Sequence, residues 1–558
     1  MNHPSPPNFL NGYTLMLLSL AVYLPLFWQL PLIRSESMYA LIPREMLASG
    51  SWLTPSLNGV PYLDKPHLIY WLNLIAYKLL GVSDWVARIP TLAISLGEIW
   101  VTYLLGRRLL GQKAAWLGAF VLLSSIGFCA MHSQILIDHL ITLFLALSLY
   151  SFLRWQEQPG FRWGAVFHLC LVAGFLSKGF IGLVFPVLIS LLYTWQFRQT
   201  RVFSLLLSPK GLALVVLLMA PWVVGVEQAN PGFLKFQIIN EQVMRFLGQR
   251  QPPDINSFSL AGFWLFLGIW LLPWTFFLPA ACYRLWRQTR AGGGEDPRGR
   301  LLLIWPAVIL AFYTLSSSRI EYYSLPALPA LALVIGWRLQ KYLATPADRT
   351  LAWPLLGIGL LGLSLLLLLP RLEQICVDNR REFAGMFSLL TPLARRTVLV
   401  IPALALAGAV AGLRRRPRAA LCCYGALALT LAVSTFQALL ILSPLLSDKL
   451  PGEYLRSRAG PQDLVIMEQI EEFEYGASLA FYSGQRLLMV QRHGLPQFPY
   501  PVPPAADYLI GPERLHELWD GPRRVFLLVD DCTTPDPYLQ DARVALAIPG
   551  KRLLVNHP

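Results

Sequence analysis

Charged and aromatic residues gather in one short stretch of an otherwise apolar chain. The stretch from Arg34 to Asn73 follows the first long apolar run and combines both kinds of side chain: Glu36, Arg44, Glu45, Asp64, Lys65, His67, Tyr39, Trp52, Tyr62, Tyr70 and Trp71. Carboxylates at such a place can accept protons, and lysines can bind anions. The pattern predicts chemistry or recognition in the first loop outside the apolar runs.

Further ionisable residues stand near the ends of later apolar runs. Asp138 lies near the outer end of one, where an acid costs a few kcal/mol unless it is paired, so we interpret it as functional. Lys65 and Lys178 fall on the outer side, where they either bind a lipid phosphate or extend to the headgroups. Glu241 and Arg245 have helical spacing and contact either a substrate or each other.

The sequence does not require a cofactor, and the binding of a divalent metal ion remains an open alternative. His67, His132 and His139 could join Asp138 or Glu36 around a metal, but no spacing requires it, and hydrogen-bonded structural histidines are favoured. The seven cysteines have no metal-type spacing and are interpreted as small core residues. The sequence contains no Walker loop, zinc motif or serine-triad elbow.

The elements that must position these residues are membrane helices. The 558 residues are 55% hydrophobic and 14% charged, whereas a soluble chain has about a quarter charged residues. Mean hydropathy is +0.50. The net charge of +14 comes from Lys and Arg in short loops on alternate sides of the apolar runs, as the positive-inside rule predicts, and not from a nucleic-acid surface.

The apolar runs predict a polytopic α-helical membrane part over residues 1–442 with about 13 spans. Placing the basic loops inside puts the N-terminus in the cytoplasm. The external loop 33–85 is predicted to carry two surface helices, which end at Gly50 and Gly81. Lys178 is expected in a tight turn between two spans.

The composition changes at about Ser443, and residues 443–558 are predicted to form a small external α/β domain. Short apolar runs bounded by Gly, Pro and Asp read as strands: DLVIMEQ, SLAFYSG, RLLMVQR, ADYLIG, RVFLLVD and RVALAIPG. The segment GPERLHELWD reads as a helix between them.

A series of motifs then resembles a known family. The first loop contains, in order, the motifs YA–IPREMLASG–W, P–LNG–PY, KP and YWLN. Later in the chain follow the motifs LID, SKGFIGLVFPVL, NEQVMRF and SSSRIEYYSLPALP. Together they resemble the aminoarabinose lipid A transferases, in the superfamily of the protein O-mannosyltransferases. The resemblance covers essentially the whole chain and implies the fold of the membrane GT-C glycosyltransferases.

The resemblance implies an enzyme of the bacterial inner membrane that takes a sugar from a polyprenyl-phosphate carrier and passes it to an acceptor at the periplasmic face. It implies no nucleic-acid partner. The family shows Asp-Glu where this chain has Ser35-Glu36, so Glu36 is the predicted catalytic carboxylate and Asp138 the second acid. Lys65 matches the lysine of the family's EKP motif.

Other predicted substrate contacts also come from the matching words. Arg319 and Tyr323 match a Lys and a Tyr of the relatives, whose tyrosine is linked to the carrier phosphate, and Glu321 replaces a Pro. Tyr39, Arg44, Lys178, Glu241 and Arg245 complete the predicted substrate-binding set.

Two other classes of function remain open. A transporter or flippase would show paired repeats and charges along a pathway, but here the ionisable residues cluster at one face. A non-catalytic, lipid-binding relative is suggested by Ser35. The sugar is aminoarabinose or a hexose, and the acceptor is lipid A, a protein hydroxyl, a hopanoid or another glycan. Lipid A is the favoured acceptor.

Overall fold

The computed structural model describes the chain except residues 1–9, 34–35, 199, 252–256, 291–296, 346, 380, 470–475, 492–507, 531–536, 540–541 and 558. By its internal contacts the chain divides into two units. The first comprises residues 1–28, 90–369 and 393–437, and the second comprises residues 29–89, 370–392 and 438–558. Each unit is described by itself.

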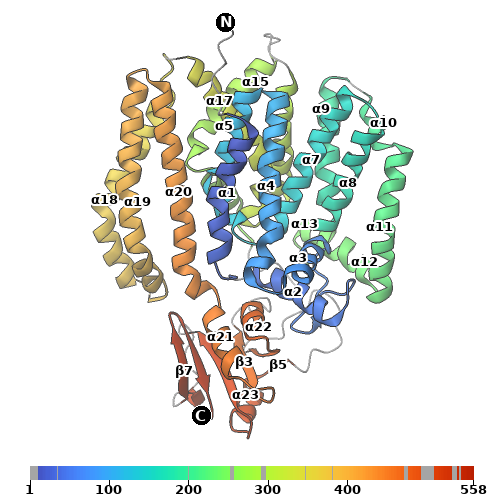
Figure 1. The fold of residues 1–558 in the computed structure, drawn as a ribbon, viewed down its shortest axis with the longest axis vertical. Coiled ribbons are helices and arrows are strands. Elements are labelled where there is room, and N and C mark those ends of the chain that lie inside the picture. The colour runs from blue at the N-terminus through green and yellow to red at the C-terminus, as the bar shows by residue number, and fades with distance from the viewer. Residues whose placement is uncertain are drawn as a thin grey trace. The chain divides into compact units, whose positions relative to one another are not determined.

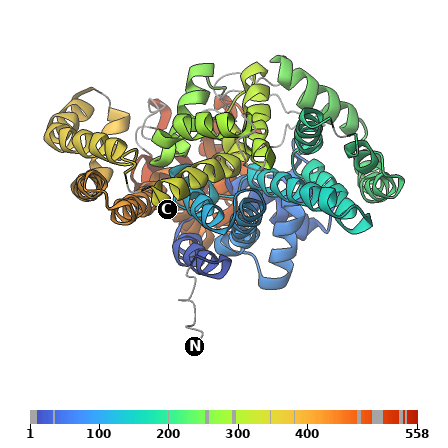
Figure 2. The same cartoon turned by 90° about the horizontal axis from the view of Figure 1, so that it is seen from above.

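The described residues of the first unit form helices joined by turns and loops, without a strand, and Figures 1 and 2 show its long helices from the side and end-on. Its elements begin with α1 (Gly12–Gln29), α4 (Asp84–Leu109), α5 (Gln112–Leu123), α6 (Ile126–His132), α7 (Ile137–Glu157), α8 (Phe161–Lys178), α9 (Ile181–Gln196), α10 (Val202–Leu206) and α11 (Pro209–Ala229). They continue with α12 (Phe233–Lys235), the π-helix η1 (Phe236–Met244), α13 (Arg245–Leu247), α14 (Leu260–Trp270), η2 (Trp274–Phe277), α15 (Leu278–Arg290), η3 (Pro297–Arg300), α16 (Leu301–Leu315), η4 (Glu321–Ala327) and α17 (Leu328–Ala344). The last are α18 (Ala352–Asn379), α19 (Arg381–Leu413) and α20 (Pro417–Leu446), and the start of α4, the end of α18, the start of α19 and the end of α20 belong to the second unit.

Seven helices in the described part of the chain are long and apolar enough to cross a membrane, or up to nine if each of two bent pairs is one span. Three shorter apolar helices are Leu68–Leu80, Ile181–Gln196 and Leu301–Leu315. A polytopic helical membrane fold is therefore confirmed, whereas the number of about 13 spans stays a prediction.

One of the apolar runs that predict a span, from Leu260 to Cys282, is bent. The helix α14 and the segment Trp274–Arg290 meet at 100°, as a broken span or a re-entrant loop does. Pro273 lies at the break, and its missing N–H and its ring prevent a helix from continuing. The helices α5 and α6 form a second bent pair, at 58°, so that α6 ends at His132 just before α7 begins.

The turn between α8 and α9 is as tight as predicted and places Lys178 at the last residue of α8. Gly179 has φ +75°, a conformation that favours glycine. The two helices also need small residues to approach, because a Cβ on Gly182 would lie 2.1 Å from the carbonyl carbon of Gly174. The backbone thus fixes the position from which Lys178 extends.

The second unit contains the first loop of the sequence. It is built from α2 (Glu36–Ser49), a small antiparallel pair of strands β1 (Ser56–Leu57) and β2 (Val60–Pro61), and α3 (Leu68–Leu80). The predicted helix ends are confirmed, since α2 stops before Gly50 and α3 stops before Gly81, which has φ +83°. The helix α2 begins at Glu36, which therefore lies in its first turn.

The same unit contains a six-stranded sheet, some of whose strands are labelled in Figure 1. Its order is β5-β4-β3-β6-β8-β7, from strands β3 (Leu464–Gln469), β4 (Leu487–Gln491), β5 (Leu509–Ile510), β6 (Val525–Asp530), β7 (Arg543–Ile548) and β8 (Lys551–Val555). Strands β3 to β6 pair in parallel, and β8 pairs antiparallel with β6 and β7. The accompanying helical elements are α21 (Lys449–Arg458), α22 (Ala477–Ser483), α23 (Pro512–Trp519) and η6 (Pro537–Leu539).

Five predicted strands and the helix over GPERLHELWD are found, but SLAFYSG is a helix and β8 was missed. The helix α22 is buried on all sides, so its apolar run has no alternation that separates a helix from a buried strand. Gly484, with φ +76°, closes it in the left-handed conformation typical of helix ends.

Candidate functional site

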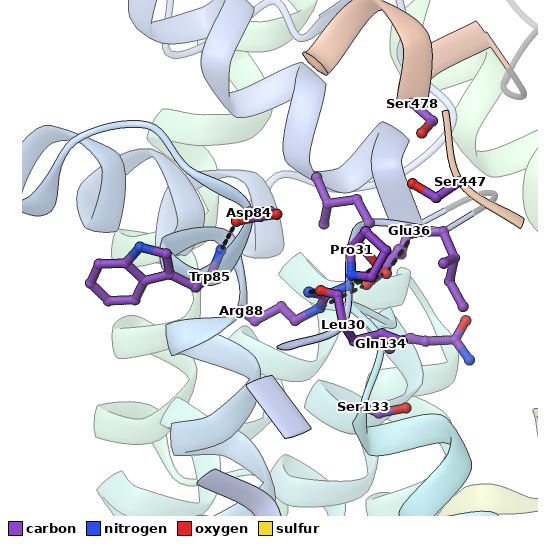
Figure 3. A network of polar contacts seen from close by, with 12 residues as sticks. Leu30, Pro31, Glu36, Asp84, Trp85, Arg88, Ser133, Gln134, Ser447 and Ser478 are labelled. Atoms are coloured by element: carbon purple, nitrogen blue, oxygen red, sulfur yellow. Dashed lines mark hydrogen bonds and ion pairs between the residues drawn. The ribbon is translucent and has the colours of Figure 1, made fainter. Parts of the chain in front are cut away.

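Glu36 is enclosed by hydrogen-bond donors of its own unit (Figure 3). Arg88, near the start of α4, donates from Nη2 to Oε1 at 2.5 Å and from Nε to Oε2 at 3.3 Å. The backbone N–H of Ile33 donates to Oε1 at 2.8 Å. Both charged side chains are 0% exposed. The pair is therefore a buried, hydrogen-bonded ion pair.

Arg88 ties this carboxylate to the preceding chain. Its guanidinium also donates to the carbonyls of Leu30 and Pro31. The Glu36 carboxylate thus accepts three hydrogen bonds, two of them from a cation, and these bonds hold it in one orientation. These contacts favour a positioning role for Glu36, and its catalytic role stays a prediction. Ser35 lies outside the described residues.

Tyr39 and Arg44, both on α2, make structural contacts. The ring of Tyr39 stacks on that of Tyr70 with centroids 6.1 Å apart. Arg44 donates from Nη1 to the carbonyl oxygen of Phe481 at 2.6 Å, and its guanidinium lies 5.8 Å from the centroid of that ring. A cation at the last carbonyls of α22 complements the negative end of the helix.

Lys65 and His67 lie in the turn before α3. Lys65 forms an ion pair with Asp64, and the Lys65 side chain is 15% exposed. His67 is buried, with Nε2 hydrogen-bonded to the carbonyl of Leu53 at 3.1 Å. Burial lowers the pKa of His67 to about 4, so the imidazole is neutral at pH 7. A buried, neutral His67 bonded to a backbone carbonyl agrees with a structural role.

A cavity of about 280 Å³ lies within the second unit. Five charged residues contribute to its lining, namely Arg44, Asp84, Lys449, Glu453 and Arg456. Lys449 donates to Asp84 at 2.8 Å, and the phenol of Tyr482 donates to the same carboxylate at 3.1 Å. Burial raises the pKa of Tyr482, so its hydroxyl keeps the proton that it donates. The lining has three cations against two carboxylates and favours an anionic guest.

The clearest reactive cluster of the first unit joins Asp138, Lys178 and Tyr323. The ammonium of Lys178 donates to both carboxylate oxygens of Asp138, at 2.7 and 2.9 Å. It also lies 4.0 Å from the centroid of the Tyr323 ring, which packs on Tyr313 with centroids 4.8 Å apart. The Lys178 and Asp138 side chains are 11% and 5% exposed.

Helix ends explain why these three groups meet. Asp138 lies in the first turn of α7 and Lys178 in the last turn of α8, where each charge is favoured by the helix dipole. Tyr323 belongs to η4, a short 3-10 turn that leads into α17. The cluster offers a carboxylate that can accept a proton and a cation that can bind phosphate.

Glu241 is clamped by two arginines. It accepts hydrogen bonds from Arg245 and from Arg250, each at 2.7 Å, and its side chain is 1% exposed. The predicted pairing of Glu241 with Arg245 is found, whereas Arg250 was missed because its spacing of nine residues is not helical. Glu241 lies in the π-helix η1, a type of helix frequent at functional sites.

Arg319 hydrogen-bonds backbone rather than a carboxylate among the described residues. Its guanidinium donates to the carbonyl of Ser316, and Nε lies 3.4 Å from the carbonyl of Phe258. Carbonyls leave the full positive charge of the side chain in place, so Arg319 keeps its capacity to bind an anion.

Two of the histidines suggested as metal ligands, His132 and His139, face Glu98 within the first unit. Glu98 lies on α4 and was not predicted as a site residue. An acid within a predicted span was the available signal, because such a residue needs a partner.

Comparisons with known proteins place the chain. Residues 64–224 match the family model described as dolichyl-phosphate-mannose-protein mannosyltransferase. An undecaprenyl phosphate-alpha-4-amino-4-deoxy-L-arabinose arabinosyl transferase 1 of Pseudomonas fluorescens is 30% identical over 385 residues, which are 65% of this chain and 67% of that protein. A protein of the same name from another strain of that species is 31% identical over 355 residues, 62% of this chain and 58% of that protein.

The fold also has a solved counterpart. The crystal structure of ArnT from Cupriavidus metallidurans bound to undecaprenyl phosphate superimposes with a TM-score of 0.79, covers 98% of both chains and shares 21% of its residues with this one. This likeness shows that the two chains share a fold.

Proposed function

Because this chain belongs to the family of the undecaprenyl phosphate-aminoarabinose arabinosyl transferases, we propose that it transfers a sugar from a polyprenyl-phosphate carrier to an envelope acceptor. The donor is a lipid, so the reacting groups belong in the membrane-spanning unit. The observation that carries the proposal is the Lys178 ammonium, only slightly exposed and held between the Asp138 carboxylate and the Tyr323 ring. A lipid A-like glycolipid is the favoured acceptor and aminoarabinose the favoured sugar.

Asp138 and Lys178 account for the proton and the charge that move in the proposed reaction. An acceptor oxygen attacks the anomeric carbon, the bond from that carbon to the carrier phosphate breaks, and the phosphate leaves with the electron pair. Asp138 takes the proton of the acceptor, and Lys178 neutralises the departing phosphate. Lys178 is bound to Asp138 in the free protein, so its shift toward the phosphate frees the carboxylate oxygens to act as the base. Attack opposite the leaving group inverts the sugar carbon.

The remaining residues have supporting roles in the proposal. Arg319, with its charge uncompensated by a carboxylate in the described residues, adds to phosphate binding. Glu241 with Arg245 shapes the site beside η1. In the second unit, Glu36 positions the first loop, and Lys65, Tyr39 and Arg44 are proposed to line the acceptor path.

The orientation follows from basic helix ends. Arg107 and Arg108 end α4, Arg154 lies in the last turn of α7, and Arg287 and Arg290 end α15, so we place these ends in the cytoplasm. The N-terminus is then cytoplasmic, and residues 443–558 form a domain on the periplasmic side of the bacterial inner membrane, after about 13 spans. Labelling Glu517→Cys in intact spheroplasts with a membrane-impermeant maleimide tests this, since that side chain is 63% exposed.

A transfer assay tests the function. The full-length protein in nanodiscs is given undecaprenyl-phosphate aminoarabinose and lipid A, and the product is measured by mass spectrometry. Asp138→Asn is expected to lower the rate about 10²-fold or more, as loss of a general base does. Lys178→Met is expected to raise the KM for the donor as well as to lower the rate.

The matched control is Glu157→Gln. Glu157 forms an ion pair with Arg108 in the same unit, but on a half-exposed surface, so its loss should leave the rate unchanged. Full transfer by Asp138→Asn would overturn the assignment of the base. Wild-type protein that binds or moves the donor without forming product would instead support the lipid-binding relative or the transporter.

A further inference from the structure

Three side chains that accept hydrogen bonds converge inside the first unit. Glu98 lies on α4, His132 is the last residue of α6, and His139 lies in the first turn of α7. His132 Nε2 is 2.9 Å from Glu98 Oε1, and His139 Nδ1 is 3.9 Å from the same oxygen. All three side chains are 2% exposed or less. The two imidazole rings are tilted by 32° to each other, with centroids 3.6 Å apart.

Backbone carbonyls determine which ring nitrogens carry hydrogen. His132 Nδ1 lies 3.0 Å from the carbonyl oxygen of Phe128, and His139 Nε2 lies 2.9 Å from that of Met131. A carbonyl oxygen only accepts, so each of these nitrogens must be the donor. In the neutral rings the remaining nitrogens, His132 Nε2 and His139 Nδ1, are then lone-pair acceptors directed at a carboxylate.

An ionised Glu98 carboxylate and these two imidazole nitrogens are all hydrogen-bond acceptors, so they cannot form hydrogen bonds with one another. One proton shared by Glu98 and His132 would account for the contact at 2.9 Å, but it would leave His139 Nδ1 without a donor. A buried polar atom without a partner costs about 1–3 kcal/mol, so a further proton or a cation is expected here. A cation at the centre of the three groups would satisfy all of them at once.

We propose that Glu98, His132 and His139 bind a divalent transition-metal ion of the Zn²⁺ type. Their ligand atoms lie within 4.8 Å of one another, and in the described residues this is the one such group of His, Cys, Asp and Glu. Two imidazoles and one carboxylate are a Zn²⁺ ligand set, whereas Mg²⁺ and Ca²⁺ prefer oxygen ligands. Metal bonds of about 2.0–2.1 Å separate tetrahedral ligand atoms by roughly 3.3 Å, between the two distances observed here.

The surroundings of the ligands agree with this assignment. Metal-binding histidines usually donate their other N–H to a carbonyl or a carboxylate, which fixes the tautomer and the ring orientation, and both histidines do so. The three ligands leave one tetrahedral position for water, as in sites of three protein ligands.

The site would link α4, α6 and α7 where the chain breaks between α6 and α7. His139 directly follows Asp138 in the sequence, so an ion bound to His139 would fix the first turn of α7, from which Asp138 reaches Lys178. The ion is a structural clamp beside the transfer site, and no step of the transfer is assigned to it.

Metal content tests the proposal without any sugar substrate, so the result does not depend on the proposed transfer reaction. The full-length protein, purified without a histidine tag, is incubated with excess ZnCl₂, desalted and analysed by plasma mass spectrometry. Wild type is expected to retain about one Zn²⁺ per chain. Glu98→Gln, His132→Gln and His139→Gln are expected to lose it.

The matched control is His168→Gln in the same unit. His168 is equally buried, and its Nδ1 lies 2.8 Å from the carbonyl oxygen of Gly164, but it belongs to no group of ligands in the described residues. This variant should keep its Zn²⁺. Added Zn²⁺ should raise the unfolding temperature of wild type and of His168→Gln only, because an ion that binds the folded state stabilises it.

Cobalt gives an independent signature. Wild type loaded with Co²⁺ should show the visible ligand-field absorption of a tetrahedral site, and this absorption should disappear in His139→Gln. A wild-type protein that retains no Zn²⁺ after desalting overturns the proposal whatever the variants do, and the three groups then share a proton. Equal Zn²⁺ content in wild type, His139→Gln and His168→Gln overturns it as well.

Discussion

Two buried ion pairs, one in each unit, look alike but are built for different tasks. In the second unit, Glu36 and Arg88 are both 0% exposed, and Arg88 also donates to two backbone carbonyls. In the first unit, Asp138 and Lys178 are slightly exposed, and the ammonium also lies against the face of an aromatic ring. The first arrangement fixes an arginine fork through several hydrogen bonds, whereas the second uses a single compact charge that can exchange one anion for another.

The difference follows from the chemistry of the two cations. Arginine has five N–H donors in a fixed fork and is used where a rigid, multiply bonded cation is needed. Lysine is a compact charge on a flexible stem, and a tyrosine face attracts it without using any hydrogen-bond donor. We therefore propose a structural role for the Glu36–Arg88 pair and a role in the reaction for the Asp138–Lys178 pair. The family resemblance of the first loop had instead suggested catalysis by Glu36.

The largest effect on stability is expected from Arg88→Ala. It leaves the Glu36 charge buried without its cation, which costs about 3–5 kcal/mol. The free energy of unfolding, measured by denaturant titration in mixed micelles, should fall by that amount. Arg108→Ala, which breaks the half-exposed pair with Glu157, should lower it by less than about 1 kcal/mol.

Replacing both Glu36 and Arg88 tests whether this ion pair has only a structural role. In Glu36→Leu with Arg88→Met no charge is left buried, so most of the lost stability should return. If Glu36 only positions the loop, sugar transfer returns with it. A double variant that is folded and stable but has no transfer activity would show that Glu36 is the catalytic base after all.

Acid should weaken the second unit through His67. Its pKa is lowered to about 4 by burial, whereas an unfolded chain has an imidazole pKa of about 6.5. Between those values the unfolded state binds more protons, so stability is complete above pH 6.5 and is lost as the pH falls toward 4. The contribution is on the order of 3 kcal/mol.

The measurement is the pH dependence of unfolding in wild type and in His67→Phe. The variant cannot titrate at this position, so the difference between the two proteins should shrink steadily from pH 7 to pH 4. Parallel stability curves over that range would show that His67 is not kept neutral by its surroundings.

Local features of this chain were predictable because they depend on a few neighbouring residues. Gly81 and Gly179 end helices where the sequence indicated, since glycine adopts positive φ at little cost. Short apolar runs bounded by Gly, Pro or Asp gave five of the strands in the described residues. The same reasoning failed for α22, whose run is apolar on every face.

The partners of the buried charges were not predictable from spacing. Arg88 is 52 residues from Glu36, and Glu98 is 34 residues from His132, so only the packing of helices brings each pair together. The sequence does indicate that an ionisable residue inside an apolar helix must have a partner, but not which residue that is. A pairing at helical spacing, such as Glu241 with Arg245, could be predicted, and the added contact from Arg250 could not.

The smallest expected effect comes from the Tyr323 ring, which is the clearest difference between the Asp138–Lys178 pair and the Glu36–Arg88 pair. Tyr323→Leu removes the ring beneath Lys178 but keeps the ion pair with Asp138. A buried cation–π contact is worth about 1–2 kcal/mol, so if the ring tunes how Lys178 binds phosphate, the KM for the polyprenyl-phosphate donor should rise about tenfold. Tyr150→Leu is the matched control, because its ring faces Arg108 at 5.8 Å, outside the cluster, and its KM should not change. If Tyr323→Leu lowers the unfolding temperature but leaves the KM unchanged, the ring serves only packing, and Lys178 is then as fixed as Arg88.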